Sequence, residues 1–384
     1  MKSTPSKIFL GLIITAAILC LIYFSRQTTV TETKVMTQVA NADSSEQTPI
    51  DTISPKLQNM SLEEKIGQMF LIGIYVNDSN TQLEKLITEE KIGSVMLMKP
   101  NITKQKVSDV TKRLRTIAEK TNHIPFFISV DQEGGIVARI KDADSDLTSQ
   151  PEIKNAEQAY DVALARGREL HEKGIDINFA PVLEYVTSSS SFLYERVFRG
   201  SKENIISLGE SMVRGYRDAG IISTVKHFPG HDDTSVDSHK NLPVSNIDSR
   251  DLAEYTRTFR EVIKNEKPPM VMTAHVSFPK IDPTYPATLS PILVGMLRTD
   301  LDFAGVIISD DMNMGAITKS FGVEKAAIQA VLAGNDILLY VATTETIKKA
   351  YQALISAVQN GQISKERIDE SVYRILKLKE SKDL

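Results

Sequence analysis

The sequence has a single cysteine among 384 residues, and it lies outside the part of the chain that we expect to fold. The folded part can therefore form no disulfide of its own, and cysteine usage does not identify a redox compartment. Basic residues are not in excess either, since 45 Lys and Arg against 49 Asp and Glu leave a net charge of −4. This balance gives no electrostatic support to a nucleic-acid partner.

The N-terminal segment, residues 1–26, has the pattern of a membrane anchor. Lys2 and Lys7 precede an uncharged, mostly apolar run over residues 8–24, and Arg26 follows it. A run of about 17 residues is at the short end of a membrane-spanning helix and longer than the core of a usual signal peptide. Lysines before the run place the N-terminus in the cytoplasm. We therefore expect a single-pass protein of the cell membrane, with the body of the chain on the extracytoplasmic side.

Secretion after signal cleavage is the alternative to an anchor. A signal peptide needs small residues soon after its apolar core, but the Ala40-Asn41-Ala42 pattern lies well downstream. A lipoprotein signal needs a small residue before the cysteine, and Leu19 stands before Cys20. Residues 27–53 are rich in Thr, Ser, Gln, Glu and Asp, which predicts a disordered tether.

Residues 54–384 alternate between short apolar runs and longer amphipathic stretches, and Ser61-Leu62-Glu63-Glu64 is a capping box that opens a helix. About eight βα units in one domain favour an α/β fold, a (β/α)8 TIM-type barrel with a parallel sheet. The predicted strands are residues 70–74, 93–98, 125–130, 176–180, 223–226, 270–273, 305–309 and 336–339. The predicted helices are residues 82–90, 104–119, 156–173, 202–219, 249–264, 291–299, 324–333, 343–360 and 365–378.

Chemically versatile side chains follow the predicted strands at their C-terminal ends, where such barrels build their sites. In strand order, from the third to the seventh, they are Asp131, Glu184, Lys226 with His227, His275 and Asp310. A random scatter of polar residues would not follow strand ends in this way. No Gly-rich phosphate cradle follows the last two strands, which argues against a phosphate-binding barrel enzyme.

Residues 226–239 hold three of the six histidines of the chain. His227 and His231 have the spacing of a helical zinc pair, but Pro229-Gly230 rules out a continuous helix, so a zinc site is disfavoured. Asp237 and His239 lie two residues apart and can point the same way on a loop. A carboxylate beside an imidazole makes a proton shuttle near neutral pH, and a pair of solvated loop residues is the alternative.

Residues 305–309 predict an apolar strand that delivers Asp310 to the mouth of the barrel. A carboxylate there can attack an anomeric carbon, because its anion stabilises a neighbouring oxocarbenium ion and then bonds to it. Asp311 is adjacent and would point elsewhere, so we expect it to cap the following turn or helix.

Two further segments suit the binding of hydroxyl groups. Asp131 opens the Asp131-Gln132-Glu133-Gly134-Gly135 segment, with Arg139 close behind, and a carboxylate after a strand can accept hydrogen bonds from vicinal sugar hydroxyls. Arg196 can bind a substrate oxygen or form a salt bridge with Glu195 or another acid, and the sequence favours neither reading.

These segments, together with Phe179-Ala180-Pro181-Val182, Lys226-His227-Phe228-Pro229-Gly230-His231, Asp237-Ser238-His239 and Ile308-Ser309-Asp310-Asp311-Met312, occur in one order along the chain. Together they resemble glycoside hydrolase family 3, and specifically its β-N-acetylglucosaminidase (NagZ-like) branch, from about Ser54 to near the C-terminus. The Asp-x-His pair is the reason to prefer this branch over the β-glucosidases of the family.

The resemblance implies a (β/α)8 barrel and a retaining mechanism, with Asp310 as nucleophile, His239 as acid/base and Asp237 as its partner. It assigns sugar binding to Asp131, Arg139, Arg196, Lys226 and His227. Glu184 departs from the pattern, since an Asp is commoner there. The implied substrate is a terminal β-linked N-acetylglucosamine on glycans or muropeptides derived from peptidoglycan. No metal or organic cofactor is implied, and we expect a monomer. The alternatives are a family 3 β-glucosidase of other specificity and a non-catalytic cell-wall glycan-binding protein.

Overall fold

The computed structural model describes residues 52–75, 81–98, 104–120, 126–142, 145–231 and 234–382. The predicted anchor, residues 1–26, and nearly all of the predicted tether lie outside the described residues. Among the helices that are described, none combines the length and the apolar character that crossing a membrane requires. Asp51–Leu384 form one folded unit.

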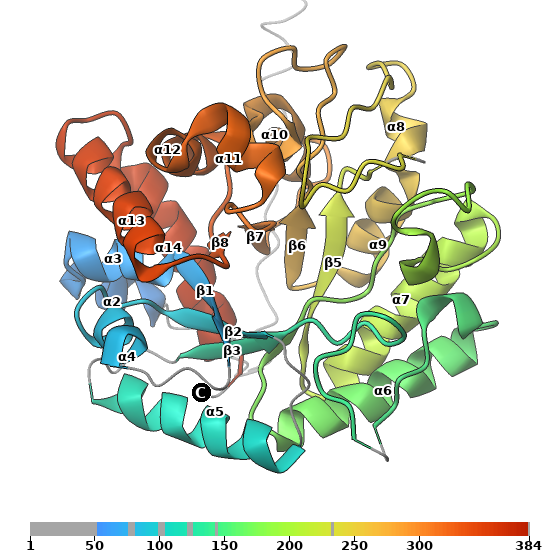
Figure 1. Ribbon diagram of the computed structural model, residues 1–384, viewed down its shortest axis with the longest axis horizontal. Helices are drawn as coiled ribbons and strands as arrows, with labels where there is room; N and C mark the ends of the chain where they lie inside the picture. Colours follow the sequence, from blue (N-terminus) through green and yellow to red (C-terminus); the bar gives the residue numbers. More distant parts are fainter. Residues whose placement is uncertain are drawn as a thin grey trace, which may run out of the picture. The chain divides into compact units, whose positions relative to one another are not determined.

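Parallel strands form the centre of this unit (Figure 1), and their order in the sheet is β7-β6-β5-β4-β3-β2-β1-β8. A further parallel bridge joins Ile308 of β7 to Ile337, directly before β8, so the two ends of the order meet. The strands therefore form a parallel, nearly closed eight-stranded barrel with helices around it, consistent with the predicted (β/α)8 TIM-type barrel. The strands are β1 Phe70–Tyr75, β2 Ser94–Met98, β3 Phe127–Val130, β4 Ile177–Asn178, β5 Ile222–Phe228, β6 Met270–Thr273, β7 Val306–Ser309 and β8 Leu338–Tyr340.

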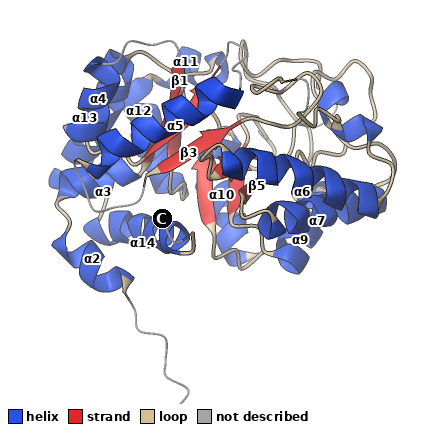
Figure 2. Ribbon diagram, turned by 90° about the horizontal axis from the view of Figure 1, so that it is seen from below, coloured by secondary structure: helices blue, strands red, loops and turns tan. Residues whose placement is uncertain are grey.

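Helices surround the strands on the outside of the barrel (Figure 2). The helices that follow β1 to β8 in turn are α4 Thr81–Thr88, α5 Lys104–Glu119, α6 Ala156–Glu172, α7 Lys202–Asp218, α9 Arg257–Glu266, α10 Pro291–Thr299, α12 Val323–Ala333 and α13 Thr344–Gln359. The last helix, α14 Lys365–Glu380, packs against α2 Ile53–Asn59 and α3 Leu62–Gln68. The capping box predicted at Ser61 and Glu64 is present at the start of α3.

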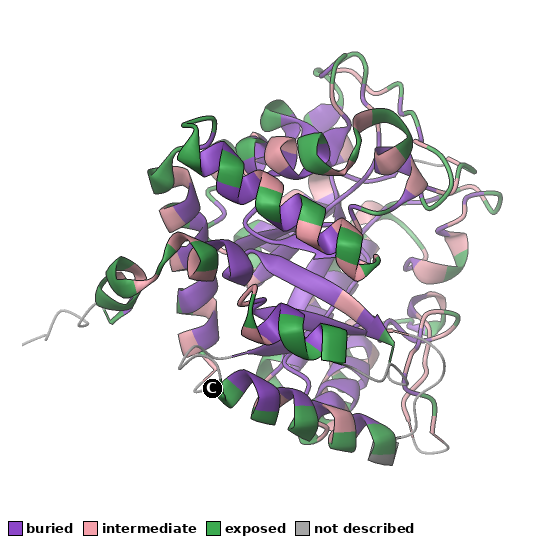
Figure 3. Ribbon diagram, turned by 60° about the vertical axis from the view of Figure 1, so that its left-hand side comes forward, coloured by how far each residue is buried: buried purple, intermediate pink, exposed green. Residues whose placement is uncertain are grey.

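The burial pattern explains why these segments form strands. Every residue of β3, β5, β6, β7 and β8 is buried, as expected for strands that are covered by side chains on one face and by helices on the other. Buried and exposed residues alternate along the helices (Figure 3), because one face of each helix is buried and the other is exposed. This division matches the amphipathic pattern from which they were predicted.

Two local predictions differ from the structure, and one helix was not predicted. The helix expected over residues 249–264 is two helices, α8 Leu252–Tyr255 and α9, separated at Thr256, which leaves helical geometry and whose hydroxyl donates to the Leu252 carbonyl at 2.8 Å. Helix α2 begins at Ile53, at the end of the predicted tether, where Ile53 and Leu57 pack on the core. Helix α11, Gly315–Phe321, was not predicted, since its short sequence carries little helical periodicity.

Candidate active site

A cavity of about 420 Å³ opens at the C-terminal ends of the strands. This is the end of the barrel at which the fold builds its functional sites. Seven of the eight predicted site residues line it, namely Asp131, Arg139, Arg196, Lys226, His227, His239 and Asp310. Asp237, the eighth, does not line the cavity but contacts His239. The structure therefore gathers one site from residues that are spread along the chain from position 131 to position 310.

Asp310 directly follows the buried strand β7. Its amide donates to the Thr273 carbonyl of β6 at 3.1 Å, and its Oδ1 accepts from the Asp311 amide at 2.8 Å. Burial disfavours its charged form, but the imidazoles of His227 and His275 and the Asp311 amide outweigh burial and keep the pKa of Asp310 below its usual value. At neutral pH the side chain of Asp310 is therefore an anionic carboxylate.

Asp311 faces a different environment, although it is adjacent to Asp310. Its Oδ1 accepts from the Asn313 amide at 3.0 Å and from the Val341 amide at 2.9 Å, so it caps the following turn as the sequence predicted. Burial, reinforced by the charge of Asp310, outweighs these hydrogen bonds and raises the pKa of Asp311 to about 7. The two adjacent carboxyl groups thus differ in protonation over the mildly acidic range.

Asp237 and His239 form the predicted pair on the loop that follows β5. Asp237 Oδ1 lies 2.8 Å from His239 Nδ1 and accepts from the His239 amide at 3.0 Å. A carboxylate can only accept, so Nδ1 carries the hydrogen in this contact, and Nε2 is the position left for proton exchange. Both side chains are solvent-accessible, with 36% of Asp237 and 67% of His239 exposed.

The start of helix α11 holds this loop in place. The Gly315 amide donates to the His239 carbonyl at 3.1 Å, and the Ala316 amide donates to the Ser238 carbonyl at 3.3 Å. Lys319 Nζ donates to the Lys240 carbonyl at 2.6 Å. The unpredicted helix α11 therefore connects the loop of the Asp–His pair to the β7 side of the barrel.

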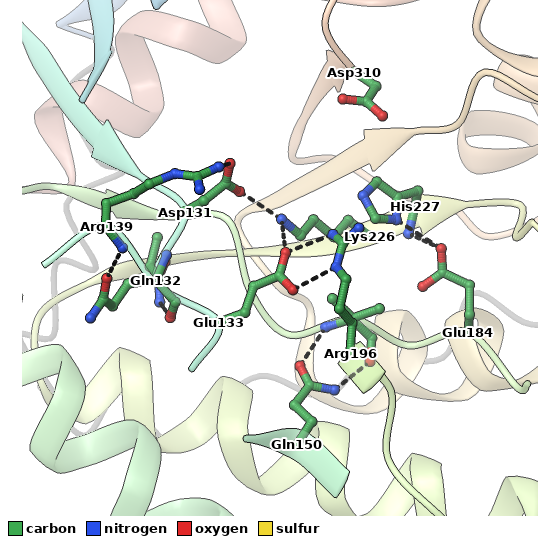
Figure 4. Close-up of polar contacts among 12 residues, drawn as sticks. Asp131, Gln132, Glu133, Arg139, Gln150, Glu184, Arg196, Lys226, His227 and Asp310 are labelled. Atoms are coloured by element: carbon green, nitrogen blue, oxygen red, sulfur yellow. Dashed lines mark hydrogen bonds and ion pairs between the residues drawn. The ribbon is translucent and has the colours of Figure 1, made fainter. Parts of the chain in front are cut away.

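Four of the five predicted sugar-binding residues, Asp131, Arg139, Arg196 and Lys226, join Glu133 in an ion-pair network (Figure 4), while His227 pairs with Glu184. Lys226 Nζ lies 2.7 Å from Asp131 Oδ1 and 2.6 Å from Glu133 Oε1. Arg139 Nη2 lies 3.3 Å from Asp131 Oδ2, and Arg196 pairs with Glu133. Alternating positive and negative groups hold one another's side chains in fixed positions, so their remaining donors and acceptors are oriented before a ligand arrives.

Glu133 is the member of this network that the sequence analysis did not identify as a site residue. Burial disfavours its charged form, but the guanidinium of Arg196 and the ammonium of Lys226 outweigh burial and lower the pKa of Glu133 to about 2. Its place two residues after Asp131 was the available signal, because alternate residues of an extended segment point the same way. The acid partner of Arg196 is thus Glu133, whereas Glu195 lies near Arg199 at 3.8 Å.

Glu184 brings His227 and His231 together. Its Oε1 accepts from the His227 amide at 3.0 Å and lies 2.8 Å from His227 Nδ1 and 3.2 Å from His231 Nδ1. The two imidazole rings meet edge to face, with centroids 5.1 Å apart, although they share no helix. Carboxylates and imidazoles are common zinc ligands, and the possible ligand atoms of Glu184, His227 and His231 lie within 4.8 Å of one another. The hydrogen bonds to Oε1 account for the geometry observed, in which Glu184 orients His227 toward the cavity.

Comparison with known proteins extends these observations. The model of the Glycosyl hydrolase family 3 N terminal domain matches residues 61–378. Beta-hexosaminidase A of Pseudoalteromonas piscicida is 33% identical over 332 residues, which cover 78% of this chain and 55% of that protein. The chain thus spans about half the length of this relative.

Solved structures agree with the sequence comparison. A glycoside hydrolase family 3 β-N-acetylglucosaminidase from Paenibacillus sp. str. FPU-7 superposes with a TM-score of 0.79 at 38% identity, over 84% of this chain and 63% of that one. A β-N-acetylhexosaminidase from Beutenbergia cavernae DSM 12333 superposes with a TM-score of 0.78 at 27% identity, over 84% of this chain and 99% of that one.

Proposed function

Because this chain belongs to glycosyl hydrolase family 3, we propose that it is a retaining β-N-acetylglucosaminidase that releases terminal β-linked N-acetylglucosamine. The observation that carries the proposal is the placement of Asp310 and His239 on one cavity, with Asp237 bound to His239. An anionic carboxylate and a positioned imidazole supply the nucleophile and the proton shuttle of a double displacement. The names of the similar proteins support the same substrate class.

In the first step, Asp310 attacks the anomeric carbon and the bond to the leaving oxygen breaks. The depressed pKa of Asp310 supports this role, because only the anion is nucleophilic. The product of the step is a glycosyl ester of Asp310. The Asp311 amide donates to Oδ1 of Asp310. If Oδ2 forms the bond to the sugar, Oδ1 becomes the carbonyl oxygen of the ester and keeps this hydrogen bond.

His239 protonates the leaving oxygen in the first step and deprotonates the incoming water in the second. The hydrogen bond from Nδ1 to Asp237 supports this assignment, because it leaves Nε2 to exchange the proton and stabilises the imidazolium that carries it. The exposure of His239 also gives water access to the acid/base. Water then releases the sugar with retained configuration.

The ion-pair network holds the sugar. The carboxylate of Asp131 and the ammonium of Lys226 lie side by side. The carboxylate can accept a hydrogen bond from one sugar hydroxyl, and the ammonium can donate one to another. Arg139, Arg196 and His227 complete the polar floor of the cavity. Fixed partners of this kind position the ring against Asp310 and favour its distortion toward the transition state.

The test is hydrolysis of a chromogenic β-N-acetylglucosaminide by the wild type and by Asp310→Ala. We expect the substitution to abolish turnover while the melting temperature stays close to that of the wild type. Near-normal hydrolysis by Asp310→Ala would sink the nucleophile assignment. A matched β-glucoside, run beside the N-acetylglucosaminide, tests the substrate, and a higher kcat/KM on the glucoside would contradict the proposed specificity.

We further propose that the natural substrate is a peptidoglycan fragment, and that residues 1–26 anchor the enzyme on the outer side of the membrane. The charge pattern around residues 8–24 supports the anchor. Digestion of purified muropeptides, followed by mass spectrometry, should show loss of terminal N-acetylglucosamine. Fractionation should find the full-length chain in membranes, accessible to protease added from outside. Recovery of a shortened chain from the medium would contradict the anchor.

A further inference from the structure

His275 contacts the backbone of Asp311, the residue next to Asp310, and neither binds the sugar nor transfers a proton in the chemistry proposed above. It follows β6, is completely buried and does not line the cavity. The sequence placed it at a strand end, as it did the residues that line the cavity. We propose that His275 is a positioning residue for Asp310, which acts by holding the backbone turn that aims this carboxylate.

The contacts of the His275 ring carry the proposal. Nε2 lies 3.0 Å from the carbonyl oxygen of Asp311, and Nδ1 lies 2.9 Å from Thr288 Oγ1. A carbonyl oxygen only accepts, so Nε2 carries a hydrogen and donates it to Asp311. Thr288 is itself fixed, because its amide donates to the Ala274 carbonyl at 3.1 Å and its carbonyl accepts from Asn335 Nδ2 at 2.8 Å. The ring is therefore held on both sides.

The other contacts of Asp311 connect His275 to the nucleophile. The Asp311 amide donates to Asp310 Oδ1 at 2.8 Å, while its carboxylate accepts from the amides of Asn313 and Val341. Asp311 is thus held through its carbonyl by His275 and through its side chain by the turn and by the segment after β8. Because these contacts fix the backbone of Asp311, they also fix the direction in which its N–H points at Asp310 Oδ1. This hydrogen bond sets the rotation of the Asp310 carboxylate, which must be aligned with the anomeric carbon for attack.

Loss of the His275 donor would release one of these points. The Asp311 carbonyl would then turn toward another donor, and its peptide groups would turn with it. A displacement of about 1 Å at a reacting group can cost about 100-fold in rate. Because His275 contacts neither the cavity nor the ion-pair network, sugar binding should change far less than the chemical step.

The experiment compares His275→Leu with His275→Gln on a chromogenic β-N-acetylglucosaminide. Leucine removes the donor at similar volume, whereas the amide nitrogen of glutamine can occupy the position of Nε2. We expect His275→Leu to lower kcat by about 100-fold with KM within about threefold of the wild type, and His275→Gln to restore kcat at least about tenfold. Thr111→Val is the matched control, because it removes a buried hydroxyl that donates to the Lys173 carbonyl at 2.7 Å, far from the cavity.

A folded His275→Leu variant with kcat within about threefold of the wild type would overturn the inference. So would a parallel change in kcat and KM that glutamine does not reverse, since that result indicates a merely structural histidine. If His275→Leu does not fold, Thr288→Val serves instead, with an expected loss of about fivefold in kcat at constant KM, and an unchanged kcat would again overturn the inference. The inference rests on Asp310 as nucleophile, so Asp310→Ala is run in parallel. An active Asp310→Ala refutes the proposed function, whereas an inactive one beside a fully active His275→Leu refutes only the role of His275.

Discussion

Arg196 meets Glu133 through two parallel hydrogen bonds, from Nε to Oε2 at 2.9 Å and from Nη2 to Oε1 at 2.7 Å. Glu133 Oε1 also lies 2.6 Å from Lys226 Nζ, so one buried carboxylate holds two cations that line the cavity. The pairing fixes the plane of the guanidinium and the reach of the ammonium before a sugar binds. Glu133 thus acts on a ligand through its neighbours and does not line the cavity itself.

Glu133→Gln should therefore weaken both binding and stability. The substitution leaves Arg196 and Lys226 buried with one carboxylate fewer, and breaking a buried ion pair costs about 3–5 kcal/mol in the free energy of unfolding. We expect a higher KM, measured by steady-state kinetics, and a lower midpoint in urea denaturation. Glu195→Gln is the control, since Glu195 is exposed and its ion pair with Arg199 is long, at 3.8 Å. Equal stability of the two variants would show that Glu133 does not organise the site.

His239→Ala should reduce hydrolysis in proportion to how much the leaving group needs protonation. We expect a loss of about 100-fold or more for an unactivated disaccharide and a much smaller loss for a nitrophenyl glycoside. Asp237→Asn should lower kcat as well, because an amide neither stabilises the imidazolium nor fixes the tautomer. Asp248→Asn is a matched control, since Asp248 also accepts from the amide two residues later, at 2.9 Å, on an exposed loop. Equal losses on both kinds of substrate would argue against His239 as the acid/base.

Gly315→Ala should disturb the loop that carries the Asp–His pair. A Cβ atom at Gly315 would lie 2.5 Å from the Lys240 carbonyl oxygen and 3.0 Å from that of His239, so the backbone on one side must move. We expect kcat to fall while KM changes little, because Gly315 contacts the loop of residues 239–240 and none of the residues of the ion-pair network. Gly295→Ala in helix α10 is the control, with nothing within 4 Å of its added methyl group. It should leave turnover unchanged and stabilise the helix by up to about 1 kcal/mol. Wild-type kcat in Gly315→Ala would show that the loop tolerates displacement.

The raised pKa of Asp311 predicts that the stability of the fold depends on pH. Its pKa rises from 3.8 to about 7 on folding, so between about pH 4 and pH 7 the folded state binds more protons than the unfolded state at this group. The stability that this group contributes is fully present below about pH 4. It is lost as the pH rises from about 4 through 7, and the total loss in the free energy of unfolding is roughly 4 kcal/mol. Asp311→Asn removes this titration and should gain stability relative to the wild type from about pH 4 to about pH 8. Urea denaturation of both proteins at several pH values measures the difference, and a constant difference would contradict the raised pKa.

The local pattern of the chain predicted most of the fold, because buried parallel strands are short apolar runs and their connecting helices are amphipathic. The runs at β3, β6 and β7 were located within a few residues of their observed bounds. Helix α11 was missed because the contacts that stabilise it, from the amides of Gly315 and Ala316 to the loop of residues 238–239, are not local. Between α8 and α9, the Thr256 hydroxyl donates to the Leu252 carbonyl, and hydrophobic periodicity does not record a side-chain hydrogen bond of this kind.

Short segments of the chain were enough to identify the family, the barrel and the position of Asp310 at a strand end, since an apolar run specifies both a strand and the point where it leaves the core. The partners of the site residues, in contrast, became known from the folded barrel. Glu133 meets Arg196 across 63 residues, Glu184 meets His227 across 43, and His275 meets Asp311 across 36. Such contacts depend on closure of the barrel, which brings the ends of different strands to one rim and is not encoded in the pattern of any single segment.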